Sequence, residues 1–121
     1  MRTFWMVGLL LTTALTWAGP IVSQTFIDPG KQFVLGGQQR GAFRVEAHNV
    51  GPVPVSVAER QPDGTLTERG RLEPTQRATL AFGAGSAAIV RNLGETKATL
   101  DFRITGNVSV GMGMRYEGLK N

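Results

Sequence analysis

Apolar and polar residues alternate with a period of two along most of the chain. Within 42–49, three apolar residues share one face and three polar residues share the other: Phe43, Val45 and Ala47 against Arg44, Glu46 and His48. The same repeat recurs in 53–60, 76–83 and 96–105. A period of two indicates strands with one buried and one solvated face, which antiparallel sheets allow. The pattern therefore predicts an all-β chain.

Turn residues separate these segments. Pro62-Asp63-Gly64 combines a preset φ with a glycine that accepts positive φ. Gly106-Asn107 lies between two alternating segments and predicts a two-residue hairpin. The predicted architecture is one small antiparallel β-sandwich of seven or eight strands, which resembles immunoglobulin-like or cupredoxin-like sandwiches and by itself implies no function. The expected strands are 24–27 (or an extended arm), 32–36, 42–49, 53–60, 65–69, 76–83, 87–92, and 96–105 paired with 107–116.

The first eighteen residues have the layout of a secretory signal peptide. Arg2 precedes an apolar run from Phe4 to Ala18, and Thr16-Trp17-Ala18 predicts cleavage before Gly19. A retained membrane anchor is the alternative, but the run is short and three threonines interrupt it. The domain assignment is thus a signal peptide at 1–18 and one sandwich domain at 19–121. Because there is no cysteine, packing alone must hold the exported domain, which favours a bacterial periplasmic or extracellular protein.

Charge and composition exclude several kinds of partner. The formal net charge is +4, but acidic residues are interleaved with the basic ones. Nucleic-acid binding needs basic residues clustered on one face, so no nucleic-acid partner is expected. Both tryptophans, Trp5 and Trp17, lie in the signal segment, so the mature domain has no tryptophan on which a sugar or a base could stack. We expect no stable membrane insertion after the signal is removed.

Two methionines, Met112 and Met114, have two interpretations. They continue an alternating apolar series with Val108, Val110 and Tyr116. The favoured interpretation is the buried face of a strand, because methionine is a common core residue. The alternative is a copper site in which thioethers bind Cu(I) and His48 adds a nitrogen. His48 lies in phase with the polar face of its own strand, which disfavours the shared site.

Three residues suggest a docking face. Gly111 and Gly113 alternate on one strand face, and paired glycines in a strand allow close approach of another backbone. A tight bend in the sheet would also explain them. Pro54 lies within an alternating segment and predicts that the strand 53–60 is at a sheet edge or is bulged there. An edge strand is where a partner or a second copy can add.

The chain offers little for catalysis. It has one histidine, no cysteine and no Gly-x-Ser-x-Gly elbow. Glu59 continues the apolar phase of its segment, so a raised pKa at the core rim would support carboxylate chemistry. A position at a solvated strand end is favoured for it. We therefore predict a non-enzymatic binding or assembly domain without cofactor, acting on another protein or on itself. The alternatives are a copper-handling protein and, less favoured, a carboxylate-dependent hydrolase.

Overall fold

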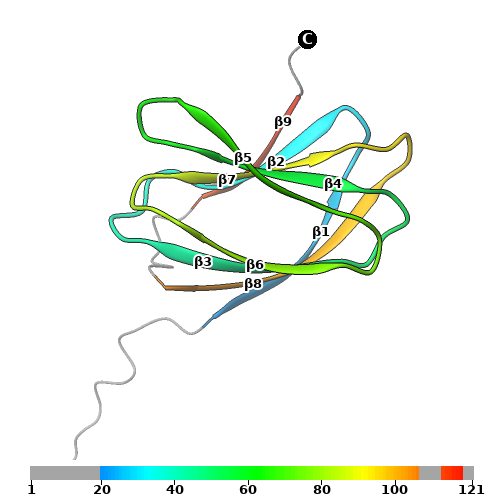
Figure 1. Cartoon of the computed structure of the whole chain (residues 1–121), viewed down its shortest axis with the longest axis horizontal. Helices are drawn as coiled ribbons and strands as arrows, with labels where there is room; N and C mark the ends of the chain where they lie inside the picture. The colour runs from blue at the N-terminus through cyan, green and yellow to red at the C-terminus, as the bar shows by residue number, and fades with distance from the viewer. Residues whose placement is uncertain (1–19, 107–112, 119–121) are drawn as a thin grey trace, which may run out of the picture.

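The computed structural model describes residues 20–106 and 113–118, and these residues form a β-sandwich (Figure 1). The strands are β1 (Ile21–Ile27), β2 (Lys31–Gly36), β3 (Phe43–Asn49), β4 (Val55–Arg60), β5 (Leu66–Leu72), β6 (Arg77–Phe82), β7 (Ala87–Asn92), β8 (Ala98–Gly106) and β9 (Met114–Gly118). One sheet has the order β1-β8-β3-β6 and the other the order β5-β4-β7-β2-β9. All the pairings are antiparallel, so the predicted fold class is confirmed. The predicted signal segment 1–18 lies outside the described residues.

The core lies between the two sheets and is tightly filled. Phe33 of β2 stacks on Phe102 of β8 with ring centroids 5.8 Å apart, which joins the sheets through their aromatic residues. Phe43 and Phe82 stack side by side within the four-stranded sheet at 5.2 Å. An internal void of only about 10 Å³ remains among the core side chains. This void is no larger than a water molecule needs.

A second, smaller apolar cluster lies on the outer face of the five-stranded sheet. Its members are Val34, Ala58, Ala87 and Ile89, all nearly inaccessible to solvent. In the strand register Arg115 lies opposite Val34, and Arg60 lies opposite Ala87. Aliphatic stems of long basic side chains can cover neighbouring apolar groups in this way while the charge stays in water. The central strands of this sheet are consequently buried on both faces, unlike the alternating strands of the other sheet.

Two buried asparagines shape neighbouring loops at one end of the sandwich. Asn49 ends β3 and Asn92 ends β7, and each side-chain oxygen accepts a hydrogen bond from the glycine N–H two residues later. Each amide nitrogen also donates to two backbone carbonyls: Asn49 to Val53 and Leu72, Asn92 to Ile27 and Thr96. The two Asn-x-Gly turns thus satisfy carbonyls where strands end. Their glycines have no room for a Cβ, which would lie 2.6 Å from the Thr99 nitrogen at Gly51 and 2.5 Å from Val53 at Gly94.

The opposite end depends on Gln39, which is 3% exposed. Its side-chain nitrogen donates to the carbonyls of Gly83 and Ser86, and its oxygen accepts from the N–H of Gly37. The β2–β3 loop is therefore held to the β6–β7 turn. The predicted Pro62-Asp63-Gly64 turn is confirmed, with Gly64 at φ +92°.

Three strand predictions are wrong: the hairpin after 96–105, the edge or bulge at Pro54, and the start of the first strand. β8 has β1 and β3 as its two neighbours, while β9 pairs with β2 in the other sheet, so the predicted hairpin between 96–105 and 107–116 does not form. β4 lies between β5 and β7 and is not an edge. The bulge in this region lies between Val57 and Ala58, not at Pro54, which precedes β4. The segment expected as a strand or an extended arm at 24–27 is a strand that begins earlier, at Ile21, and pairs with β8.

Candidate functional site

Met114 does not lie in the core, so the buried-face interpretation of this residue is wrong. The side chain is 40% exposed, and the next residue of that series, Tyr116, is 56% exposed. In the register they lie opposite Leu35 and Phe33, which are core residues. Both therefore point to the inner side of the five-stranded sheet. They remain exposed because β9 is the edge strand of that sheet. Met112 lies outside the described residues.

The structure does not bring His48 and Met114 together. His48 lies on β3 between Arg77 and Asp101 of the neighbouring strands, in phase with the outward residues of the four-stranded sheet. Met114 lies on the far margin of the other sheet. Within 20–106 and 113–118, no group of three or more His, Cys, Asp or Glu residues is placed to hold a metal ion.

Glu59 lies at the rim of the sandwich and forms an ion pair. Its carboxylate, with 15% of the side chain exposed, accepts a hydrogen bond from Arg69 at 2.7 Å. Burial raises the pKa of Glu59, but hydrogen bonds from Ser86, Gly83 and Arg69 together outweigh it and leave the pKa lowered. The expected solvated strand end is therefore wrong. A lowered pKa is also the opposite of what a general acid at neutral pH requires.

Of the predicted docking residues, the structure describes Gly113 and Pro54, which lie in different segments. Gly113 precedes β9, and its carbonyl accepts a hydrogen bond from Gly36 at 2.8 Å. A Cβ on Gly113 would meet no atom within 4 Å, so one side of this residue faces open space. Pro54 belongs to the loop before the interior strand β4, where its carbonyl accepts from Leu93. Gly111 lies outside the described residues, so the paired-glycine groove stays a prediction.

One side of the sandwich, between the edge strands β5 and β6, is closed by Arg69. The register shift between Val57 and Ala58 makes Arg69 the extra residue of β5. Its guanidinium donates to Glu59 and to the Ala81 carbonyl of β6, and it lies 5.1 Å from the centre of the Phe82 ring. A bulge and an inward-directed charge are two devices that protect edges from unwanted pairing.

On the other side, no residue within 20–106 or 113–118 pairs with the outer edge of β1 or of β9. Phe26 of β1 and Tyr116 of β9 line one depression there, together with charged residues of the β1–β2 turn and its surroundings. β1 reads IVSQTFI, with no charged residue and no proline, whereas β5, β6 and β9 each carry a charge. Val22 is 72% exposed and Phe26 is 48% exposed. Among the edge strands of the described residues, β1 alone has no charged residue of its own, and a nearby charge is Lys97, whose Nζ lies 5.9 Å from the centre of the Phe26 ring.

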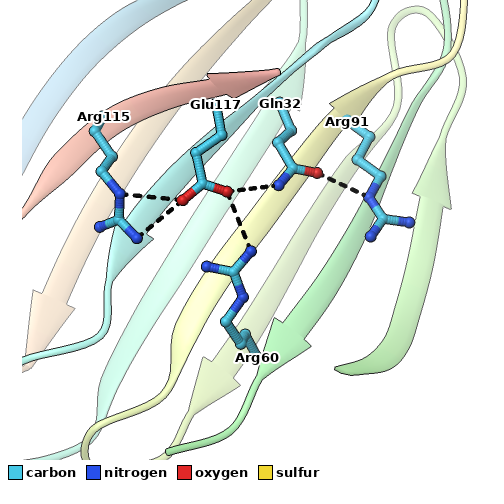
Figure 2. Close-up of polar contacts among 5 residues, drawn as sticks. All are labelled: Gln32, Arg60, Arg91, Arg115 and Glu117. Atoms are coloured by element: carbon cyan, nitrogen blue, oxygen red, sulfur yellow. Dashed lines mark hydrogen bonds and ion pairs between the residues drawn. The ribbon is translucent and has the colours of Figure 1, made fainter. Parts of the chain in front are cut away.

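A polar network covers part of the outer face of the five-stranded sheet (Figure 2). We call it the arginine face; its members are Gln32, Arg60, Arg91, Arg115 and Glu117. Figure 2 shows the Glu117 carboxylate at its centre, with one oxygen accepting from Gln32 at 2.9 Å and from Arg60 at 3.2 Å. The second oxygen accepts two hydrogen bonds from Arg115, at 3.2 and 3.0 Å. The Gln32 oxygen accepts in turn from Nε of Arg91 at 3.1 Å.

The arginine face carries more positive than negative groups. Arg60 and Arg115 contact the Glu117 carboxylate, and Arg91 is linked to it through Gln32. Three guanidinium groups and one carboxylate leave an excess of two positive charges among the five side chains. Hydrogen bonds from Arg60 and then from Gln32 lower the pKa of Glu117 from 4.5 to about 2, against a smaller opposing effect of burial. Glu117 is therefore ionised at any physiological pH. The arrangement can hold an anion, and it has no nucleophile paired with a base.

Reasoning from sequence missed the arginine face because its members come from four strands far apart in the chain. Gln32 and Glu117 are 85 residues apart, and Arg60 and Glu117 are 57 apart. The interleaving of acidic and basic residues along the chain suggested a uniformly mixed surface. Only a strand register would have revealed the cluster.

The described residues contain no helix long and apolar enough to cross a membrane. Comparison of the chain with protein-family models, with curated proteins and with solved structures finds no match. β1 and the arginine face are the candidate functional surfaces of the described residues.

Proposed function

We propose that this chain is an exported, non-enzymatic assembly domain that pairs with a second copy of itself along β1. The observation that supports the proposal is the outer edge of β1, which pairs with no other described strand. β1 is seven residues long, has no charged residue and includes the exposed Val22 and Phe26. An edge of this kind presents unpaired N–H and C=O groups to any strand that can align with it. The apolar side chains supply the affinity that backbone hydrogen bonds alone lack in water.

The sequence of β1 is self-complementary about Gln24. If two copies pair antiparallel around a two-fold axis at Gln24, Val22 of each copy lies opposite Phe26 of the other. Both contacts lie on the outer face, because Ser23 and Thr25 point inward with the core residues of β8. Aromatic pairs with β-branched residues stabilise antiparallel strands by ~0.2–1 kcal/mol each. The symmetry also limits assembly to a closed dimer, since a two-fold interface uses each edge once.

The dimer would join two four-stranded sheets into one continuous sheet. Its order would be β6-β3-β8-β1 followed by the same strands of the second copy in reverse. This arrangement occupies the one described edge strand that contains no charged residue and leaves β5, β6 and β9 unchanged. A different protein that contributes a single strand to β1 would use the same hydrogen bonds, so the experiment must distinguish the two occupants.

Native mass spectrometry of the full-length chain, exported from a bacterial host and purified, tests the proposal. We expect a dimer of residues 19–121 that dissociates on dilution, and a monomer for the Phe26→Lys variant. Val50→Lys is the matched control, because Val50 is 42% exposed but lies outside any strand; it is expected to remain dimeric. A wild-type monomer up to millimolar concentration, or a Phe26→Lys dimer, would refute self-pairing. A heterologous chain co-purifying with the monomer would instead favour strand addition by another protein.

A further inference from the structure

We propose that the arginine face binds an acidic peptide segment of a partner protein, whose carboxylates pair with Arg91 and Arg60 while an aliphatic side chain enters the depression beside them. The depression has a volume of about 460 Å³ and is lined by both arginines together with Leu66 and Leu93. This site lies on the opposite sheet from β1. The proposal is therefore independent of self-pairing.

The internal carboxylate of Glu117 shows what chemistry this face recognises. It accepts hydrogen bonds from two guanidinium groups, and Arg115 holds it through two nitrogens. Planar guanidinium groups bind carboxylates through such paired, charge-assisted hydrogen bonds. One carboxylate balances only one of the three cationic groups, so further carboxylates are favoured at the same face.

Arg91 is the group best placed to accept a ligand. Gln32, only 6% exposed, links it to Glu117 and fixes the position of its Nε. The two terminal nitrogens of Arg91 make no hydrogen bond or ion pair with another described residue, and Figure 2 shows them directed away from Gln32. A side chain held at one nitrogen loses less conformational entropy when its other nitrogens bind a ligand.

Leu66 and Leu93 indicate that the ligand is not a simple inorganic anion. Each is 44% exposed, and both line the depression that contains Arg60 and Arg91. Exposed apolar side chains beside charged donors are typical of sites that bind a peptide with both kinds of group. The surface is hollowed rather than protruding, which favours insertion of a side chain over contact with a lipid surface.

Titration of the 15N-labelled full-length protein with a capped peptide of alternating Glu and Leu residues tests the proposal. We expect saturable shifts of the Gln32 side-chain amide and the Leu66 and Leu93 backbone amides. Arg91→Gln is expected to weaken binding roughly tenfold, as the loss of one charge-assisted pair does. Arg44→Gln is the matched control, since it removes the same charge from an exposed position on the other sheet; it is expected to leave the affinity within about twofold.

Four outcomes would overturn the proposal. Equal weakening by Arg44→Gln and Arg91→Gln would reduce the binding to general electrostatic attraction. Equal binding of a peptide with Gln in place of Glu would show that carboxylates are not recognised. Inorganic phosphate that displaces the peptide at a comparable concentration would indicate a plain anion site. Binding to vesicles that contain phosphatidylglycerol, without binding to the peptide, would assign the face to a membrane surface.

Discussion

Replacing Glu117 by glutamine is the most direct test of the arginine face. The substitution keeps the size of the side chain and removes the charge that Arg60 and Arg115 share. Gln32 would donate its hydrogen bond to a neutral amide instead of a carboxylate. Arg91 would then be less firmly oriented, because Gln32 holds its Nε. We expect Glu117→Gln to lower the free energy of unfolding at neutral pH and leave the fold intact.

The size of the effect follows from the pKa of Glu117. A shift from 4.5 to about 2 corresponds to at most ~3.5 kcal/mol, since one pKa unit equals ~1.4 kcal/mol. The side chain is 29% exposed, so solvent screening reduces this. We expect a destabilisation of roughly 1–2 kcal/mol at pH 7.

The loss of stability in Glu117→Gln depends on pH, and the direction of this dependence follows from the lowered pKa of Glu117. A carboxylate whose pKa is lowered by folding stabilises the protein fully above its unfolded pKa, and this stabilisation is lost as the pH falls through the folded value. Urea unfolding of wild type and variant should therefore show a difference that is constant above about pH 5 and shrinks toward zero near pH 2. Glu95→Gln, at an exposed loop position, is the control. Equal stability of wild type and Glu117→Gln at pH 7, or a difference that persists at the acidic end, would refute the reasoning.

Three further predictions concern Asn92, Gly94 and Met114, and urea unfolding measures each. Asn92→Ala leaves the carbonyls of Ile27 and Thr96 without their buried donor and should cost ~1–3 kcal/mol; an unchanged midpoint would contradict the role of the Asn-x-Gly turn. Gly94→Ala should destabilise because its Cβ would lie 2.5 Å from Val53, whereas Gly70→Ala meets no atom within 4 Å and should be tolerated. Met114→Ala should cost under ~1 kcal/mol, against ~2–5 kcal/mol for a methionine truncated in a core; a large loss would restore the buried interpretation.

Local sequence patterns were sufficient to predict most strands. The segment 87–92 was expected as a strand and forms β7 with the same limits. The expected strand 42–49 forms β3 over Phe43–Asn49, with alternate buried and accessible positions. These predictions succeed because side chains of a strand alternate between two faces whatever its neighbours are. Turn residues succeed for the same local reason, as the Asp63-Gly64 turn shows.

Predictions that required a partner strand failed. Gly106-Asn107 is a valid local hairpin signal, but β8 is already paired on both sides, with β1 and β3. The apolar phase of Met114 and Tyr116 correctly places them on the core side of their sheet, yet both are exposed because β9 is its outermost strand. Alternation identifies residues that share a face and does not show whether another sheet covers that face.

The amino-acid sequence by itself therefore determined the all-β class, most strand limits and the turns, because these depend on backbone preferences and on the period of burial within short segments. The tertiary structure alone decided which edges remain free and which charges meet. β1 is a free, uncharged edge only because β8 takes one of its sides and no described strand takes the other. The arginine face exists only because the register aligns Glu117 with Gln32, and Gln32 with Arg91. Both candidate surfaces arise from pairings between distant segments, which carry no signal in a local pattern.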